Sequence, residues 1–328
     1  MLAAYYEKFG PAHEALCIAE VQSPQPGPGE VSVRVHASGV NPYDVKLRGG
    51  VSAAQMPFPR IIPHCDGAGI IDAVGSGVDH QRIGERVWIW NGQVQRAFGT
   101  AAQIIALPAE QAAPLPPGLS FEEGACLGVP YLTAYQALLY NGPIDGKTVV
   151  VTGGGGSVGF YAIQIAKAKG AACIIATVST SEREAHARRA GADHVLDYKK
   201  ADIGAAVRDI TAGAGADRLI EVEFGLNVPF FTHVLRPGGA VFSYGSAGNM
   251  MPKLDFKSIN SHGLTMHFSS VYRMGPQLRA QAVADLFDFP PEGFVHPVGR
   301  VFDLPSIAAA HENVEAGRTI GNTVIRIA

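Results

Sequence analysis

The residues with the clearest chemical meaning form a glycine-rich segment between Val149 and Ala171, with the sequence VVVTGGGGSVGFYAIQIAKAKGA. An apolar run comes first, the glycines follow, and a stretch with helical spacing completes the segment. Gly154, Gly156 and Gly159 match G-x-G-x-x-G, which permits a tight turn, close approach of the backbone to a pyrophosphate, and close packing of a helix on a strand. The unpaired N–H groups at the start of the helix would face the phosphates. The segment therefore predicts a dinucleotide-binding site.

The choice between NAD and NADP is made about 20 residues beyond such glycines, where the second strand ends. The stretch there, TVSTSERE, includes Ser179, Thr180, Ser181 and Arg183, and Ser179 stands where an NAD-preferring site would usually present Asp or Glu to the ribose 2′-hydroxyl. Hydroxyls and a guanidinium suit a 2′-phosphate, so we expect NADPH. Alternatively, the hydroxyl residues cap a helix over residues 181–189, and the two roles can coexist.

Composition sets the broad class of the protein. The 328 residues are 47% hydrophobic and 17% charged, which is typical of a globular chain with two domains. A net charge of -3, a pI near 6.4 and the lack of a basic run argue against a nucleic-acid partner. No apolar stretch reaches membrane-spanning length, and the N-terminal residues do not resemble a signal peptide. Four cysteines without paired spacing suit a reducing compartment, so we expect a cytoplasmic protein.

The pattern of elements changes along the chain. The first 120 residues contain short β-rich runs broken by Gly, Pro and Asn, which predict a barrel-like domain. Helical spacing follows over Phe121–Tyr140, and then apolar runs alternate with helical segments. A helix near residues 306–317 and a final strand from Asn322 suggest that the chain returns to the first domain. We expect an α/β protein with a doubly wound parallel sheet over residues 122–268 and a β-rich domain over residues 1–121 and 269–328. The candidate strands of the middle region are VVVTG, CIIATV, ADHVLDY, DRLIEVE, GGAVFSYG and GLTMHF.

Several further motifs fall in the order of a known family. They are GVNPYDVKLRGG (Gly39–Gly50), the Pro63–Val78 segment with DGAGIIDAVGSGV, GERVW (Gly84–Trp88), AFGTAAQIIALPAE (Ala97–Glu110), LPPGLSFEEGACLGVPYLTAYQAL (Leu115–Leu138) and GRTIGNTVI (Gly317–Ile325). Together with the glycine loop, they make the chain resemble the medium-chain dehydrogenase/reductase superfamily, and within it the zinc-free quinone oxidoreductases similar to zeta-crystallin. The resemblance implies a GroES-like, partly open barrel as substrate domain, a Rossmann domain, and an active site in the cleft between them. It also implies a homodimer paired through the Gly263–Phe268 strand.

Zinc alcohol dehydrogenases of the same superfamily are the main alternative, because they use a thiolate, an imidazole and a further thiolate or carboxylate around an open metal position. Where they carry Cys-His-x-Asp, this chain has Asn41-Pro42-Tyr43-Asp44, and where they carry Gly-His-Glu it has His64-Cys65-Asp66. Neighbouring residues on a strand point to opposite faces, so the latter three cannot all converge on one ion. The stretch from Trp88 to Gly99 has no cysteine for a structural zinc loop. We therefore expect no metal.

The resemblance also assigns roles to individual residues. Asn41 and Asp44 would be catalytic, holding the substrate oxygen or a water, although Asn-Pro-x-Asp is equally good turn chemistry. Arg48, Asp66 and Trp90 would line the substrate pocket. Lys46 stands where the family often has an aromatic hydroxyl, which leaves the proton donor open. The cofactor-binding residues would be Thr133, Gly154, Gly156, Ser157, Val158, Gly159, Ser179, Thr180, Arg183, Tyr198, Ser243, Gly245, Phe268, Ser270 and Asn322.

These expectations combine into one function and its rivals. Nicotinamide C4 carries the transferable hydride, so a metal-free protein needs only to position a quinone or an α,β-unsaturated carbonyl (enone) near it. The sequence therefore predicts an NADPH-dependent quinone or enone reductase. The rivals are a zinc-type alcohol dehydrogenase and a non-catalytic NADPH-binding or RNA-binding protein, and the acidic pI disfavours RNA.

Overall fold

The computed structural model describes residues 1–290 and 293–327. The chain divides into two compact units. The outer unit comprises Met1–Val129 and His296–Ala328, and the central unit comprises Pro130–Val295. Both breaks lie later in the chain than the boundaries after residues 121 and 268 that the sequence suggested.

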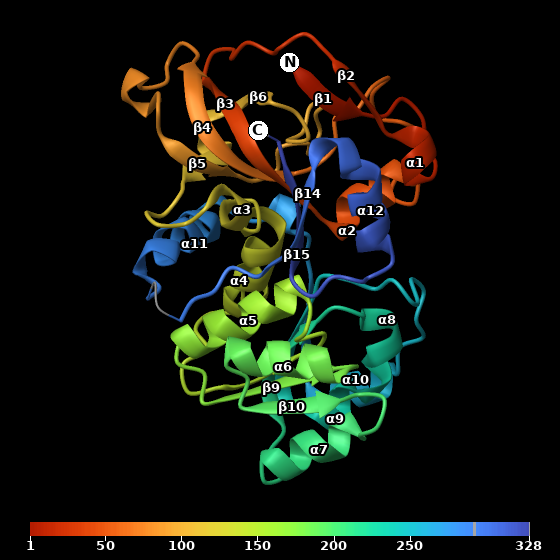
Figure 1. Cartoon of the computed structure of the whole chain (residues 1–328). Helices are drawn as coiled ribbons and strands as arrows, with labels where there is room; N and C mark the ends of the chain where they lie inside the picture. The colour runs from red at the N-terminus through yellow and green to blue at the C-terminus, as the bar shows by residue number, and fades with distance from the viewer. Residues whose placement is uncertain (291–292, 328) are drawn as a thin grey trace. The chain divides into compact units, whose positions relative to one another are not determined.

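The central unit is built on a six-stranded sheet in which every pair of neighbouring strands is parallel. Helices cover both faces, with α5 and α6 on one side and α7 and α9 on the other (Figure 1). This is the doubly wound Rossmann sheet predicted from the sequence, and all six predicted strands are present. The strand order is β10 (His194–Asp197), β9 (Cys173–Val178), β8 (Thr148–Val151), β11 (Ala216–Glu221), β12 (Leu235–Ser243) and β13 (Thr265–Phe268).

Burial explains why these strands read as unbroken apolar runs. A parallel sheet covered by helices on both faces needs apolar side chains pointing in both directions. Val150, Ile175, Leu219 and Val241, from four different strands, are all buried in one core. The covering helices are α5 (Ser157–Ala168), α6 (Ser181–Ala190), α7 (Ile203–Ile210), α8 (Phe224–Asn227), α9 (Phe231–Val234) and α10 (Phe256–His262).

The order of the strands creates a crevice at one point of the sheet. The chain moves outward from β8 to β9 and β10, and then returns to the other side of β8 with β11. Ligands of doubly wound sheets bind at such a reversal, outside the carboxyl ends of the strands. The glycine-rich segment follows β8 directly, so it lies at this place.

The stretch with helical spacing before the Rossmann sheet is interrupted. It forms α3 (Phe121–Gly124), a π-helical turn over Leu127–Tyr131, and α4 (Leu132–Leu139). Pro130 lies inside the turn and has no N–H to continue a regular ladder. The second break in the chain comes after α11 (Pro276–Asp288) because this helix packs on the start of α4. There the Tyr131 hydroxyl donates to the Ala282 carbonyl at 2.7 Å.

The outer unit contains a seven-stranded, mainly antiparallel sheet and a small two-stranded sheet, which agrees with the β-rich domain that the sequence predicted. Apolar side chains of β3 and β4, including Val33, Val35 and Ile71, are fully buried in its core. The large sheet has the order β14 (Val298–Asp303), β15 (Asn322–Arg326), β3 (Glu30–Val40), β4 (Asp66–Val74), β5 (Arg86–Ile89) and β7 (Ala112–Pro114), with β6 (Ile104–Pro108) paired to β3. The remaining elements are β1 (Leu2–Tyr5), β2 (Cys17–Glu20), α1 (Ala12–Ala15), α2 (Pro42–Arg48) and α12 (Ile307–Glu315).

The packing of α5 on β8 yields a first prediction. A Cβ on Gly159 would lie 2.4 Å from the Gly153 carbonyl oxygen and 2.7 Å from the Gly154 Cα. Both atoms are backbone and cannot rotate away, so Gly159→Ala should lower the free energy of unfolding by about 1–3 kcal/mol in urea titrations. Gly275→Ala is the matched control because its Cβ meets no atom within 4 Å. Equal, small effects of the two substitutions would contradict this account of the packing.

Candidate functional site

The loop after β8 contains four successive glycines, Gly153 to Gly156, so it consists of backbone without side chains. Gly153 has a φ of +64°, and the Gly154 N–H donates to the Thr177 carbonyl at 2.9 Å. A Cβ on Gly154 would lie 2.7 Å from the Cβ of Ala176. Helix α5 begins at Ser157, and its N-cap residue Gly156 has no side chain to bond the N–H groups of the first turn, including those of Ser157 and Val158. The loop therefore fits an anion such as a pyrophosphate at the helix N-terminus.

Arg183 lies against this loop. Its Nη1 donates to the Gly155 carbonyl at 3.0 Å, and a Cβ on Gly155 would lie 2.5 Å from the Cβ of Arg183. The Thr180 hydroxyl accepts from the Arg183 N–H at 3.3 Å, so Thr180 caps α6, as the alternative interpretation proposed. Ser179 precedes the cap and is half-buried. The cap and the guanidinium thus occupy one turn beside the glycine-rich loop, and the role of this turn toward a 2′-phosphate stays a prediction.

Two hollows open near the carboxyl ends of the Rossmann strands. The first, of about 440 Å³, is lined by Gly153, Thr177 and Val222, and by Tyr198, which is 53% exposed. The second, of about 750 Å³, brings together four predicted residues at the ends of β12 and β13, and Phe224 and Arg273 also line it. Thr133, by contrast, is buried in the first turn of α4 and lines neither hollow. The four predicted residues in the second hollow are Ser243, Gly245, Phe268 and Ser270.

In the outer unit, Asn41, Asp44 and Asp66 form one buried cluster. The Asn41 N–H donates to Asp44 Oδ2 at 2.7 Å at the start of α2, which is the turn chemistry weighed from the sequence. The Asn41 side-chain amide donates to Asp66 Oδ2 at 2.8 Å, and the Val129 N–H donates to the same oxygen at 2.7 Å. The three side chains are at most 5% exposed. The N-cap residue of α2, Asn41, and the first residue of β4, Asp66, are therefore held in direct contact.

Burial changes the ionisation of this cluster. Removal from water raises the pKa of Asp44 to about 7, and it raises the pKa of Asp66 well above its ordinary value, with the nearby Asp44 adding to the effect. The Oδ1 atoms of both residues have no hydrogen-bond partner among the described residues. A carboxyl group with these properties can hold a proton near neutral pH, which is useful for a group that supplies protons.

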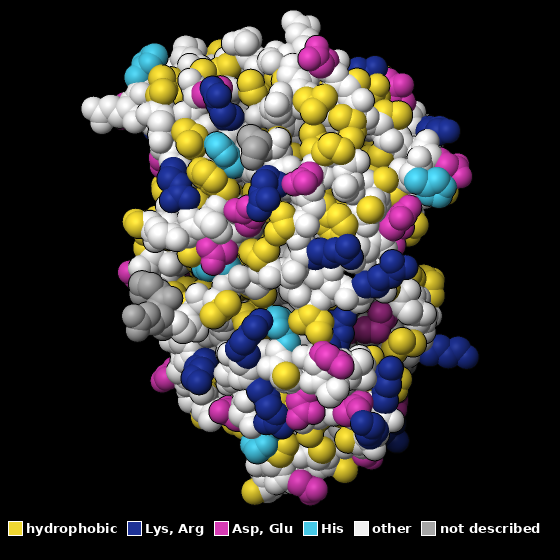
Figure 2. Space-filling view, viewed as in Figure 1, with side chains coloured by type: hydrophobic (Ala, Val, Ile, Leu, Met, Phe, Trp, Pro, Cys, Tyr) yellow, Lys and Arg dark blue, Asp and Glu magenta, His cyan; other side chains and the backbone are white. Residues whose placement is uncertain are grey.

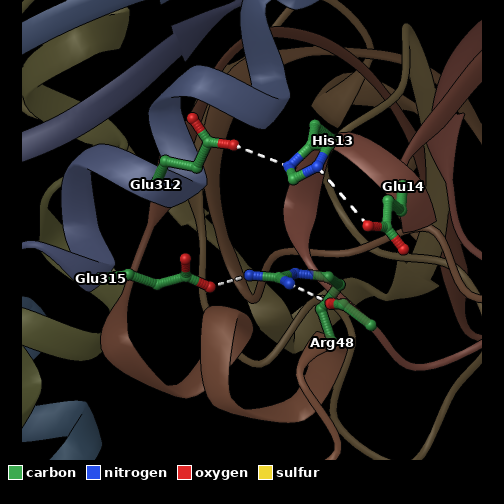
Figure 3. A network of polar contacts seen from close by, with 6 residues as sticks. His13, Glu14, Arg48, Glu312 and Glu315 are labelled. Atoms are coloured by element: carbon green, nitrogen blue, oxygen red, sulfur yellow. Dashed lines mark hydrogen bonds and ion pairs between the residues drawn. The ribbon is translucent and has the colours of Figure 1, made fainter.

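Three other predicted residues of this unit have structural partners. The Arg48 guanidinium donates to the Gly10 carbonyl and to Glu315, which lies on α12 (Figure 3). Trp90 is buried directly after β5. The Asn322 side-chain amide donates to the Pro297 carbonyl at 3.1 Å. Their roles toward a substrate or cofactor stay predictions.

The residues around His64 do not fit a zinc site. His64 Nδ1 lies 2.8 Å from Ser38 Oγ, and His64 Nε2 lies 2.9 Å from His311 Nε2, so both ring nitrogens are engaged. The partners of Asp66 are Asn41 and Val129. Within residues 1–290 and 293–327, no three His, Cys, Asp or Glu side chains are grouped so that they could hold a metal ion.

Sequence reasoning missed Glu221, which ends β11 beside the glycine loop. It is fully buried, and its Oε1 accepts from the Asn227 side-chain amide at 2.9 Å and from the Glu223 N–H. Its Oε2 has no partner in the described part of the chain, and burial raises the pKa of Glu221 to about 7. The signal in the sequence was an acidic residue closing an apolar strand. Glu223 in turn accepts from the N–H groups of Ala247 and Gly248, each at 2.9 Å, and holds the loop after β12.

A Rossmann sheet with a glycine-rich phosphate loop, together with a GroES-like unit, defines a medium-chain dehydrogenase/reductase. Residues 27–117 match the alcohol dehydrogenase GroES-like domain, and residues 157–288 match the zinc-binding dehydrogenase domain. The chain is 30% identical over 326 residues to the quinone oxidoreductase of Homo sapiens, covering 97% of this chain and 94% of that protein. The chain therefore belongs to the quinone oxidoreductase family of this superfamily.

Solved structures agree with this assignment. The quinone oxidoreductase of Escherichia coli, determined in complex with NADPH, is 26% identical with a TM-score of 0.86, and the match covers 100% of both chains. A protein described as an NAD-dependent alcohol dehydrogenase is 30% identical with a TM-score of 0.87, again over 100% of both chains. None of the helices in the described residues combines the length and the hydropathy that a membrane span requires.

The buried carboxyl of Glu221 yields a prediction about pH. Its pKa is raised from 4.5 to about 7, so the folded state holds a proton that the unfolded state has already lost in this interval. The protein should therefore lose stability relative to Glu221→Gln as pH rises from 4.5 through 7, by about 3 kcal/mol in total. Urea unfolding of both proteins across this range measures the difference. Glu20→Gln, at an exposed position, is the control, and a Glu221 difference as flat as that of Glu20 would refute the prediction.

Proposed function

We propose that this protein is an NADPH-dependent, zinc-independent reductase of quinones or α,β-unsaturated carbonyls. The observation that carries the proposal is the contact between Arg183 and the glycine-rich loop at the reversal point of the Rossmann sheet. The names of the quinone oxidoreductase relatives and the NADPH bound to the Escherichia coli protein support it.

The central unit would hold the cofactor. Gly154, Gly156 and Gly159, with the N–H groups of Ser157 and Val158, would receive the pyrophosphate. Arg183 and the hydroxyls of Ser179 and Thr180 would receive the 2′-phosphate, because a guanidinium pairs with phosphate through charge-assisted hydrogen bonds. The hollow beside Tyr198 would take the adenosine, and the hollow lined by Ser243 and Phe268 the nicotinamide end. Bound NADPH would supply the hydride from nicotinamide C4.

The outer unit would bind the substrate oxygen and supply the proton. Asn41 is fixed by Asp66, so its amide is held in one orientation. The Oδ1 atoms of Asp44 and Asp66 have no hydrogen-bond partner in the part of the chain that the structure describes, and burial raises the pKa of both carboxyls. A protonated carboxyl can donate a hydrogen bond to a developing alkoxide or phenoxide and then deliver its proton.

Zinc has no part in this proposal, although the superfamily includes zinc enzymes and one matching domain model is named for zinc binding. Asn41 stands where a thiolate would be needed, and its amide is already bonded to Asp66. His64 is bonded through both ring nitrogens. Neither residue is arranged to ligate an ion.

We also propose a cytoplasmic homodimer. Strand β13 stands at the edge of the six-stranded sheet, and an unpaired edge is a template for pairing with a second copy. Light scattering should give twice the 34.5 kDa chain mass, and a monomer would remove this part of the proposal. A nucleic-acid partner is disfavoured, because basic and acidic side chains are interspersed over the face shown in Figure 2.

The activity is tested by NADPH oxidation against a panel of quinones and enones, with NADH measured alongside. We expect turnover with NADPH, and we expect it to survive treatment with a chelator. Elemental analysis of the same sample checks the second point. One tightly bound zinc per chain that leaves together with the activity would identify an alcohol dehydrogenase instead.

Coenzyme choice is tested separately. Loss of a charge-assisted phosphate contact costs about 1.5–3 kcal/mol, so Arg183→Ala should weaken NADPH binding roughly tenfold or more and leave NADH binding nearly unchanged. Arg188→Ala is the matched control, because Arg188 lies on the same helix and pairs with Glu184 at the surface. Titration of cofactor fluorescence gives both affinities. Equal losses for the two cofactors, or a preference of the native protein for NADH, would contradict the assignment.

A further inference from the structure

Helix α12 contacts α2 and the segment just before β4, which together carry the cluster of Asn41, Asp44 and Asp66. Glu315 on α12 pairs with Arg48, the last residue of α2 (Figure 3). Asn41 is the N-cap residue at the other end of α2. His311 on α12 contacts His64, two residues before Asp66, with 2.9 Å between the Nε2 atoms. One helix from the end of the sequence thus contacts segments that lie far from it in the chain.

The His311 contact continues as a chain of buried hydrogen bonds. His64 Nδ1 lies 2.8 Å from Ser38 Oγ, and Ser38 Oγ lies 2.7 Å from Thr100 Oγ1. Thr100 Oγ1 in turn reaches the backbone carbonyl oxygen of Asp66. All four side chains are 0% exposed, so these bonds are shielded from bulk solvent.

Proton counting gives this chain a single direction. A carbonyl oxygen only accepts, so the one proton of the Thr100 hydroxyl goes to Asp66. Ser38 must then donate its proton to Thr100, which leaves its oxygen to accept from His64 Nδ1–H. His64 is therefore the Nδ1–H tautomer with a bare Nε2, and His311 must donate from Nε2–H. Every bond of the chain has one donor and one acceptor in this arrangement.

The second ring nitrogen of His311, Nδ1, agrees with this direction of the hydrogen bonds. His311 Nδ1 has no partner within the described residues, and in this arrangement it is a bare lone pair rather than a buried N–H. Burial lowers the pKa of His64 to about 3 and lowers the pKa of His311 well below its ordinary value, so both rings stay neutral. His64 has a φ of +81°, which is unusual for a residue with a side chain and indicates that its surroundings hold it in place.

We propose that His311 is a positioning residue, which fixes Asp66 through the one-directional hydrogen-bond chain His311–His64–Ser38–Thr100. The proposal deepens the proposed function, because Asp66 orients Asn41 in the site suggested for the substrate. His311 itself touches no reacting atom in this account. It would affect the reaction by fixing the position of Asp66, which in turn orients the side-chain amide of Asn41.

The direction of the chain is tested without any activity measurement. Long-range ¹H–¹⁵N correlation spectra of the full-length protein labelled in its histidines show which ring nitrogens carry protons. We expect His64 as the Nδ1–H tautomer and His311 as the Nε2–H tautomer, with signals assigned by their loss in His311→Gln and His64→Gln. The opposite tautomers, or an imidazolium at neutral pH, would overturn the proposal even if the enzyme were an active reductase.

The functional consequence is tested with His311→Leu, which removes the donor, and His311→Gln, which retains an N–H near the same place. The buried acceptor left by His311→Leu should lower kcat about tenfold with little change in the KM for NADPH, and His311→Gln should restore most of it. Thr100→Val removes the hydroxyl at the other end of the hydrogen-bond chain and keeps a side chain of nearly the same volume. Its effect on kcat should not add to that of His311→Leu.

A control variant and two contrary outcomes distinguish failure of the positioning role of His311 from failure of the proposed function. His13→Ala removes a surface contact to the neighbouring Glu312 and should leave kcat unchanged. If His311→Leu and Thr100→Val lower stability and leave kcat intact, the hydrogen-bond chain is structural only and the positioning role of His311 is wrong. If the native protein reduces no quinone or enone, the proposed function fails, and the tautomer spectra still decide whether the chain exists.

Discussion

The close approach of backbone to backbone between β8 and α5 is the constraint on which the central unit depends. Gly159 lies so near Gly153 and Gly154 that a side chain has no room, and this contact sets the N-terminus of α5 at the carboxyl end of β8. The reversal of strand order at the same place leaves space above the loop. Arg183 then reaches the loop from α6. The glycines, which carry no side chains, thus shape the loop to which we assign the cofactor phosphates.

The outer unit solves a different problem, which is the burial of polar groups. Asn41, Asp44 and Asp66 are removed from water, and each hydrogen bond between them satisfies a group that would otherwise destabilise the fold. The hydrogen bonding is incomplete, because the Oδ1 atoms of Asp44 and Asp66 have no partner among the described residues. A polar cluster with unmet hydrogen-bonding capacity is typical of a functional site rather than of a core.

Local pattern predicted the fold well and the long-range contacts poorly. Apolar runs with glycine punctuation located β8 to β13, because burial on both faces leaves a strong local signal. The motif also placed Gly154, Gly156 and Gly159 in one loop. The partner of Arg48 could not be predicted, because Glu315 lies 267 residues away and neither residue signals the other. The same holds for His64 and His311, 247 residues apart, and for the packing of α11 on α4, which moved the break between the units.

The position of β15 has a consequence for how the chain is made. This strand lies between β14 and β3 in the sheet, and its residues Thr323 to Arg326 pair with residues Ala37 to Val40 of β3. A ribosome releases β3 early, and the entire central unit emerges before β15 becomes available. The central unit consists of contiguous sequence, so it can fold as soon as it emerges. The outer sheet must wait with an open flank on β3 until β15 emerges, because this pairing joins strands far apart in the sequence.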